Sequence, residues 1–150
     1  MAADSPRRLS AGLRAAGGAL LIATLLVGCG GSKGVDDPAN ELPFGRVDVP
    51  AEGARVQAQT PLAGWALDDR GVREIRVYVD GRLVNHGPLT DERLDVSKAF
   101  PQYARGGNRH GWTLTMDFVV PGPHAVLVQA VDSDGATRDI AALHVTAVER

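Results

Sequence analysis

The chain has 150 residues and a mass of 15.8 kDa, which leaves room for one ordinary domain and excludes a multidomain enzyme. Eighteen glycines, nine prolines and only 5% aromatic residues indicate many turns and short strands. A formal net charge of −2 gives no electrostatic basis for nucleic-acid binding, and a single cysteine excludes an intramolecular disulfide and a thiolate zinc site.

Residues 1–28 have the pattern of a signal peptide. Three arginines within the first 14 residues precede an uncharged apolar run at residues 15–27. This run is shorter than the ~20 residues that a transmembrane helix needs. The string Leu26-Val27-Gly28-Cys29 resembles the lipobox of bacterial lipoproteins, in which a peptidase cleaves before a cysteine whose thiol carries diacylglycerol.

The lipobox resemblance implies that Cys29 is the lipidation site and the first residue of the mature chain. Diacylglycerol and an amide-linked acyl chain such as palmitate would anchor the protein to a membrane of the bacterial cell envelope. Because Gly30 follows the cysteine instead of aspartate, the resemblance implies the outer membrane, facing the periplasm or the surface, in a Gram-negative source. Residues 29–43 are rich in Gly, Ser, Asp, Asn and Pro, which predicts a flexible tether.

Residues 44–150 consist of short apolar segments separated by turns. Segment 72–79 (VREIRVYV) alternates apolar and polar residues, and Asp80-Gly81 after it favours a type I′ hairpin turn. The expected strands, in chain order, are 44–49, 62–67, 72–79, 82–86, 112–119, 124–131 and 137–147. About seven strands of this kind predict an all-β fold, an immunoglobulin-like β-sandwich. Segment 87–111 breaks the rhythm and is expected to be a long loop excursion.

Several strings in this region resemble a bacterial immunoglobulin-like domain. They include GWALDDRGVREIRVYVDG (64–81), GWTLTMDF (111–118) and PGPHAVLVQAVDSDG (121–135). The resemblance implies a non-catalytic scaffold or binding domain, although a fold alone does not fix a function. The sequence has no Gly-x-Ser-x-Gly, HExxH, phosphate-loop or GxGxxG motif, so we do not expect an enzyme.

The aromatic residues are the first candidates for a binding site. Trp65 lies in the middle of a predicted strand and is expected in the sandwich core. Trp112, Phe100 and Tyr103 could form a small apolar cluster that pins the excursion to the sheet, or a platform on which a sugar ring stacks. We favour the cluster, because a long loop without regular structure needs apolar anchors.

A small basic tip follows these aromatic residues. Arg105, Arg109 and His110 flank Gly106-Gly107, and they are expected either to be solvated or to contact an acidic glycan or partner. Trp112, Tyr103, Arg105 and Arg109 are therefore the candidate ligand-binding residues.

Topology also predicts a cluster of carboxylates. The second and sixth strands of an immunoglobulin-like sandwich run the same way, so the turns after them meet at one pole. Those turns carry Asp68, Asp69, Asp132 and Asp134, whose repulsion must be relieved by arginine, solvent or a cation. Calcium is one candidate, because it accepts six to eight oxygen ligands in loose geometry, whereas aspartate also has an ordinary role in turns. No other cofactor is expected.

Together these observations predict a lipid-anchored cell-envelope protein with a non-catalytic immunoglobulin-like domain for interaction or structure. Its partners would be the membrane and an unknown envelope protein or glycan. The alternative is a carbohydrate-binding module for envelope polysaccharide or peptidoglycan, which an exposed patch of Trp112 and Tyr103 would favour.

Overall fold

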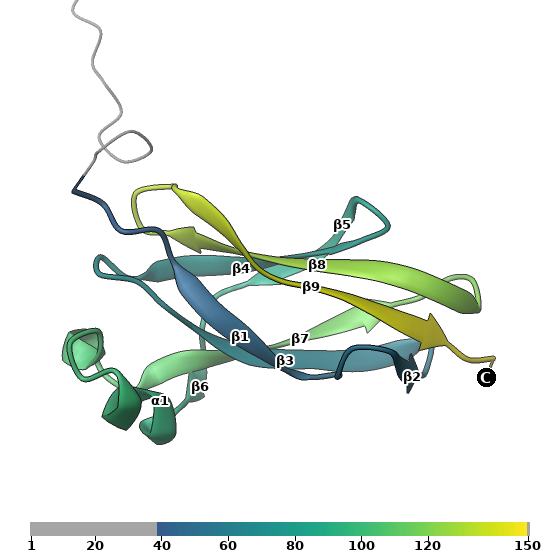
Figure 1. The fold of residues 1–150 in the computed structure, drawn as a ribbon, viewed down its shortest axis with the longest axis horizontal. Coiled ribbons are helices and arrows are strands. Elements are labelled where there is room, and N and C mark those ends of the chain that lie inside the picture. The colour runs from purple at the N-terminus through teal and green to yellow at the C-terminus, as the bar shows by residue number, and fades with distance from the viewer. Residues whose placement is uncertain (1–38, 150) are drawn as a thin grey trace, which may run out of the picture. The chain divides into compact units, whose positions relative to one another are not determined.

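The computed structural model describes residues 39–149. The predicted signal peptide, Cys29 and most of the predicted tether lie outside this range. Within it the chain forms nine strands and two short helices (Figure 1). In chain order these are β1 (Phe44–Val49), β2 (Ala54–Val56), β3 (Gln59–Leu67), β4 (Val72–Val79), β5 (Arg82–Gly87), β6 (Asp91–Glu92), α1 (Leu94–Ala99), η1 (Ala104–Gly106), β7 (Arg109–Asp117), β8 (Gly122–Asp132) and β9 (Thr137–Ala147).

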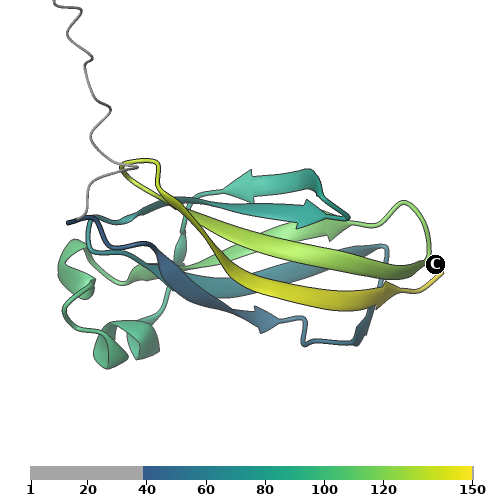
Figure 2. The same ribbon diagram turned by 45° about the horizontal axis from the view of Figure 1, so that its top comes forward.

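The strands form two sheets that face each other. The four-stranded sheet has the order β1-β3-β7-β6 and the five-stranded sheet the order β2-β9-β8-β4-β5 (Figures 1 and 2). All pairs are antiparallel except β2 with β9. This order is that of an immunoglobulin-like sandwich whose first strand is divided between the two sheets. The predicted all-β fold is confirmed.

Local sequence patterns account for most of the strands. Alternation along β4 buries Ile75, Val77 and Val79 between the sheets, as its period of two predicts. Asp80 and Gly81 take φ values of +49° and +79°, so the predicted hairpin turn joins β4 to β5. The same core includes Leu62 of β3 and further apolar residues of β7, β8 and β9.

The two tryptophans exchange the places that were expected of them. Trp112 of β7 is fully buried between the sheets, opposite Gly64 in the register of β3 with β7. A Cβ atom on Gly64 would lie 2.8 Å from Cζ2 of Trp112, so the glycine makes room for the indole. Trp65 was expected in the core, but it is only partly buried, because Leu62, Gly64 and Ala66 take the inward positions of β3.

The expected long loop contains β6, α1 and η1, and an aromatic cluster holds it against the outer side of the four-stranded sheet. The ring centroids of Trp65 and Phe100 are 5.5 Å apart, and those of Phe44 and Tyr103 are 5.1 Å apart. Phe44 also packs edge-on against Trp65 and Phe100. The predicted apolar anchor of the excursion therefore exists, but Trp65 supplies the indole in place of Trp112.

Residue 40 lies at one end of the sandwich, the proximal pole, and the other end is the distal pole. The proximal pole consists of the β3–β4 turn, the β8–β9 turn and the excursion, and the distal pole consists of the β4–β5 and β7–β8 turns (Figures 1 and 2). Asn40 donates a 2.7 Å hydrogen bond to Asp132 at the proximal pole, and Pro43 is buried. The last residues of the predicted tether thus contact the domain.

Candidate ligand cleft at the proximal pole

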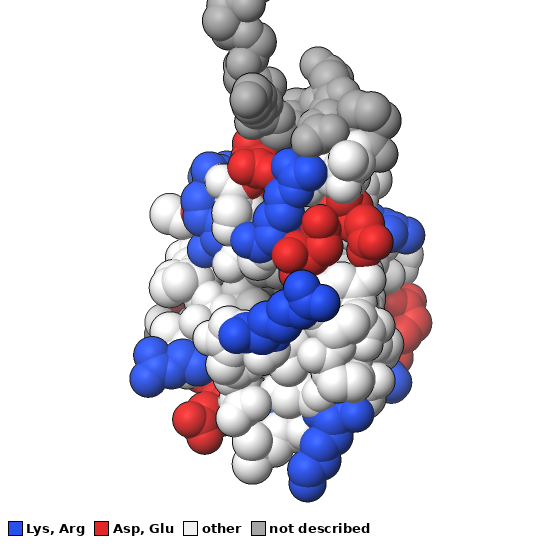
Figure 3. All heavy atoms as spheres, turned by 90° about the vertical axis from the view of Figure 1, so that its left-hand side faces the viewer, with Lys and Arg blue, Asp and Glu red and all other residues white. Residues whose placement is uncertain are grey.

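The β3–β4 turn and the β8–β9 turn, which topology predicts to meet, are joined directly by hydrogen bonds and an ion pair. The backbone N–H and the hydroxyl of Ser133 both donate to the carbonyl oxygen of Gly71, at 2.8 and 2.9 Å. Arg70 of the first turn forms a 2.7 Å ion pair with Asp134 of the second. Figure 3 looks onto this pole and shows acidic and basic side chains interleaved across it.

Asp132 has the structural role of a turn-forming aspartate. Its side chain is fully buried, and Oδ1 accepts hydrogen bonds from the backbone N–H groups of Asp134 and Ala136 at 2.9 and 2.8 Å. Its other oxygen accepts the bond from Asn40. Both carboxylate oxygens are therefore engaged within the protein.

Asp68 is buried with one oxygen satisfied. Its exposed fraction is 5%, and Oδ1 accepts a 2.8 Å bond from the backbone N–H of Arg70. Oδ2 has no hydrogen-bond partner in the described part of the chain. Burial raises the pKa of Asp68 to about 6; the bond from the Arg70 N–H opposes this shift, and the nearby charges of Asp132 and Asp69 add to it.

The contacts of the four aspartates show how their charges are compensated, and the calcium hypothesis for them stays a prediction. Among residues 39–149, no group of three or more His, Cys, Asp or Glu side chains is arranged to hold a metal ion. Arg70 offsets the charge of Asp134 and lies 3.7 Å from Asp69, and Asp132 is bonded to backbone amides. Arginine and turn hydrogen bonds thus relieve the repulsion.

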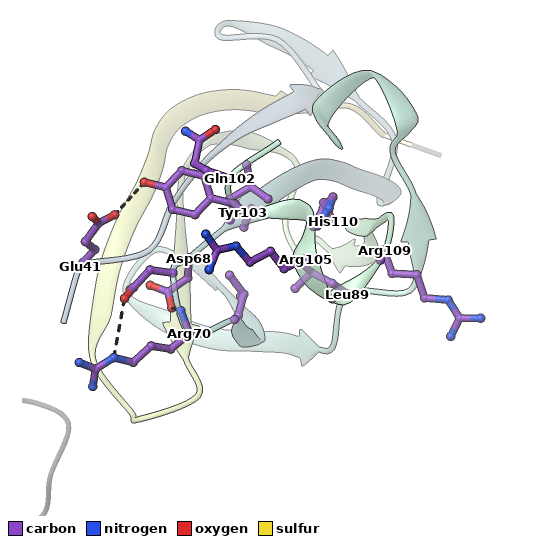
Figure 4. Close-up of a pocket in the computed structure, with 16 residues that line it drawn as sticks. Glu41, Asp68, Arg70, Leu89, Gln102, Tyr103, Arg105, Arg109 and His110 are labelled. Atoms are coloured by element: carbon purple, nitrogen blue, oxygen red, sulfur yellow. Dashed lines mark hydrogen bonds and ion pairs between the residues drawn. The ribbon is translucent and has the colours of Figure 1, made fainter. Parts of the chain in front are cut away.

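A cleft of about 560 Å³ opens beside these turns, between the β3–β4 turn and the excursion (Figure 4). Asp68, Asp69, Tyr103, Arg105 and Arg109 all line it, so the structure brings together five of the predicted site residues. In Figure 4, Arg105 extends across the cleft toward Tyr103 and the β3–β4 turn, whereas Arg109 points away from it.

Two further residues of the cleft carry polar groups. His110 is 8% exposed, and its Nε2 atom has no hydrogen-bond partner among residues 39–149. Glu41 accepts a 2.7 Å bond from the hydroxyl of Tyr103, which raises the pKa of that hydroxyl. The sequence placed His110 only in a basic tip, and it offered no signal for Glu41, which lies within the predicted tether.

Trp112 takes no part in this cleft. Because its side chain is completely buried between the sheets, no face of the indole is open for a sugar ring to stack on. The platform of Trp112 and Tyr103, which was the alternative to the apolar cluster, is therefore not present. Tyr103 remains at the cleft, partly buried against Phe44.

The distal pole presents an apolar tip. Val119 and Val120 in the β7–β8 turn are 93% and 62% exposed, and they line a hollow of about 440 Å³ with Leu83. His124 fixes this turn: its Nδ1 lies 2.7 Å from the Asp80 carboxylate and its Nε2 lies 2.8 Å from the carbonyl oxygen of Val120. The carboxylate raises the pKa of His124.

Within residues 39–149, no helix has the length and apolar character needed to cross a membrane. No protein-family model matches the chain, and no curated protein matches it.

Solved structures resemble the domain at low identity. They include a lytic polysaccharide monooxygenase of Jonesia denitrificans (14% identity, 66% of this chain, TM-score 0.44) and fibronectin(III)-like modules of Clostridium thermocellum CbhA (16%, 73%, 0.44). Latent PorU of Porphyromonas gingivalis is another (13%, 73%, 0.48). The chain spans 60%, 47% and 10% of these proteins, respectively. Such weak similarity carries no argument about function, which has to rest on the chain's own residues.

Proposed function

We propose that this chain is a lipid-anchored protein of the bacterial cell envelope whose immunoglobulin-like domain binds a ligand without catalysing a reaction. The anchor is supported by the apolar run at 15–27 and by the lipobox-like string that ends at Cys29. By the same resemblance, Gly30 favours the outer membrane in a Gram-negative source.

The binding role is supported above all by one observation in the cleft. Asp68 Oδ2 and His110 Nε2 are both buried, line the same cleft and have no hydrogen-bond partner in the described range. Buried polar groups are nearly always bonded, so two unbonded groups on residues that line one cleft require an explanation, and a bound ligand provides one.

The cleft lining also supports a role without catalysis. Its described residues include no serine, threonine, cysteine or lysine. The serine, threonine, cysteine and lysine nucleophiles of covalent catalysis are therefore absent from this lining, and its one hydroxyl, that of Tyr103, is bonded to Glu41.

The anchor is tested with Cys29→Ser. The parent protein should fractionate with membranes and have a mature mass that includes the acyl groups, whereas the variant should stay uncleaved or become soluble. Ser32→Ala is the matched control, because it changes a nearby residue and leaves the cysteine in place. Equal fractionation of all three proteins, with an unlipidated parent mass, would contradict the anchor.

The cleft is tested by photo-crosslinking in intact cells. A photoreactive amino acid at Gln102, which is exposed and lines the cleft, should crosslink to an envelope component. The same probe at Gln59, which is exposed and not part of the cleft lining, is the control. Asp68→Asn should weaken the Gln102 crosslink, and equal labelling from both positions would contradict a role for the cleft.

A carbohydrate-binding module is the second candidate. One feature of the cleft supports it, which is the partly buried ring of Tyr103 beside the polar side chains of Gln102 and Glu41. Sedimentation with insoluble peptidoglycan or polysaccharide should then be weakened by Tyr103→Ala and unchanged by Tyr78→Ala on β4. Absence of co-sedimentation would remove this candidate.

A further inference from the structure

We propose that the cleft takes a zwitterionic ligand of the amino-acid or short-peptide class, with its ammonium group at Asp68 and its carboxylate at Arg105. The proposal rests on the proposed function, in which the cleft binds a ligand. It is carried by the opposite charges at the two sides of the cleft.

The side formed by the β3–β4 turn is negative. Asp68 is 5% exposed with one free oxygen, and the buried carboxylate of Asp132 and that of Asp69 lie close enough to raise its pKa further. A buried carboxylate is costly unless a cation or hydrogen-bond donors compensate it. An ammonium group brings a positive charge and three donors, so it supplies what Asp68 Oδ2 lacks.

The neighbouring arginine does not serve this purpose. Arg70 donates its backbone N–H to Asp68 Oδ1, while its guanidinium bonds to Asp134 at 2.7 Å. The charge of Asp68 is therefore left for a group that enters from the cleft.

The side formed by the excursion is positive. Arg105 and Arg109 are exposed, and neither guanidinium forms an ion pair or a hydrogen bond with another residue in the range 39–149. Arg105 extends into the cleft (Figure 4), where its planar guanidinium could hold a carboxylate by two parallel hydrogen bonds. His110 Nε2 is a further polar contact for the ligand, as donor or acceptor according to its tautomer.

The cleft discriminates against other classes of ligand. Its volume of about 560 Å³ falls in the range of small-molecule sites. A neutral sugar would leave both the Asp68 charge and the Arg105 charge uncompensated, and an anion without an amino group would be repelled by Asp68. A metal ion would find no group of three suitable ligands in the described residues.

Ligand binding should depend on pH through Asp68. Only the ionised carboxylate attracts an ammonium group, and its pKa is about 6 in the absence of ligand. Affinity should therefore fall about tenfold between pH 7.5 and pH 5.

The test is a titration of the full-length chain in detergent, followed by NMR and calorimetry, with triglycine as the probe. N-acetyl-triglycine lacks the ammonium group and triglycinamide lacks the carboxylate, so each should bind about tenfold more weakly. Asp68→Asn and Arg105→Gln should weaken triglycine binding to a similar extent. Asp139→Asn and Arg55→Gln, which alter exposed residues outside the cleft lining, are the matched controls.

Thermal melting of each variant separates loss of binding from loss of folding. Equal affinity for triglycine and its blocked forms would overturn the proposal, as would the absence of triglycine binding at tens of millimolar. Binding of an acidic oligosaccharide such as tetragalacturonate in place of triglycine would overturn the ligand class and leave the proposed function standing. The binding role in the proposed function is contradicted by the separate crosslinking experiment, if the probe at Gln102 labels no more than the probe at Gln59.

Discussion

Replacing Asp68 with asparagine should stabilise the domain at neutral pH and have little effect at acidic pH. Asparagine keeps an oxygen for the backbone N–H of Arg70, which is 2.8 Å from the aspartate, and removes the buried charge. The folded-state pKa of about 6 lies above the ordinary value of 3.8 for an aspartate, so the folded protein binds the proton more tightly than the unfolded chain does. The wild type therefore loses stability as pH rises from about 4 to above 6.

The size of this effect follows from the shift in pKa. A difference of one in pKa between the folded and unfolded states corresponds to about 1.4 kcal/mol. The rise in the pKa of Asp68 from 3.8 to about 6 therefore sets an upper limit of ~3 kcal/mol on the loss of folding free energy. Because the cleft opens to water, which screens the charge, we expect about 1–2 kcal/mol between pH 4 and pH 7.5.

Urea titration of the wild type and Asp68→Asn at several pH values measures this difference directly. Taking the difference cancels the contributions of other titrating groups. Asp139→Asn is the control, since its side chain is exposed on β9 and bonded to Gln129. A variant less stable than wild type at pH 7.5, or a difference that does not change with pH, would refute this account of Asp68.

Four further predictions concern stability. Trp112→Ala should destabilise the domain by about 3–5 kcal/mol and Trp65→Ala by only about 1–2 kcal/mol, because Trp112 is fully buried and Trp65 is not. If urea titration gave the reverse order, the assignment of Trp112 to the core would be wrong. Gly64→Ala should cost at least about 2 kcal/mol in the same assay, since its Cβ would clash with the backbone carbonyl oxygen of Arg46 and lie 2.8 Å from Trp112 Cζ2, and a neutral effect would contradict the packing of β3. The raised pKa of His124 contributes stability below about pH 6.5 that is lost as pH rises through the folded-state value, so His124→Ala should flatten that part of the stability profile. Millimolar calcium should leave the Tm unchanged, and a rise that Asp132→Asn abolishes would support the calcium hypothesis.

The main strands were predictable because their signals are local. Alternation in 72–79 and the Asp80-Gly81 turn fixed a hairpin, and segments 44–49, 72–79 and 137–147 match β1, β4 and β9 residue for residue. The two- and three-residue strands β6 and β2 carry too few residues for any period to show. The six residues of α1 span less than two helical turns, so segment 87–111 looked irregular.

The exchange of the two tryptophans has a physical reason in each strand. Segment 62–67 (LAGWAL) is apolar throughout, so no alternation shows which face Trp65 occupies. In 112–119 the alternation is clear and places Trp112 on the face shared with Met116, which is fully buried. The pattern of that strand was thus a better guide than the size of the side chain.

The cleft could be predicted only in part, because it depends on contacts between distant segments. Strand order alone brings Asp68 and Asp132 to one pole, which sequence reasoning can establish. Asp68 Oδ2 has no hydrogen-bond partner in the described residues, and the Arg70 guanidinium contacts Asp69 and Asp134. No sequence pattern specifies these contacts.

The cleft lies at the end of the sandwich where residues 40 and 41 join the domain. Asn40 bonds to Asp132 and Glu41 bonds to Tyr103, so the chain joins the domain at the pole that carries the cleft. Eleven residue-to-residue steps lead from Cys29 to Asn40, and they span at most about 40 Å even when fully extended. If Cys29 is lipidated, the cleft is confined to the layer next to the membrane, while the apolar tip at Val119 and Val120 lies at the opposite end of the sandwich. A ligand of the cleft must therefore be present within that layer.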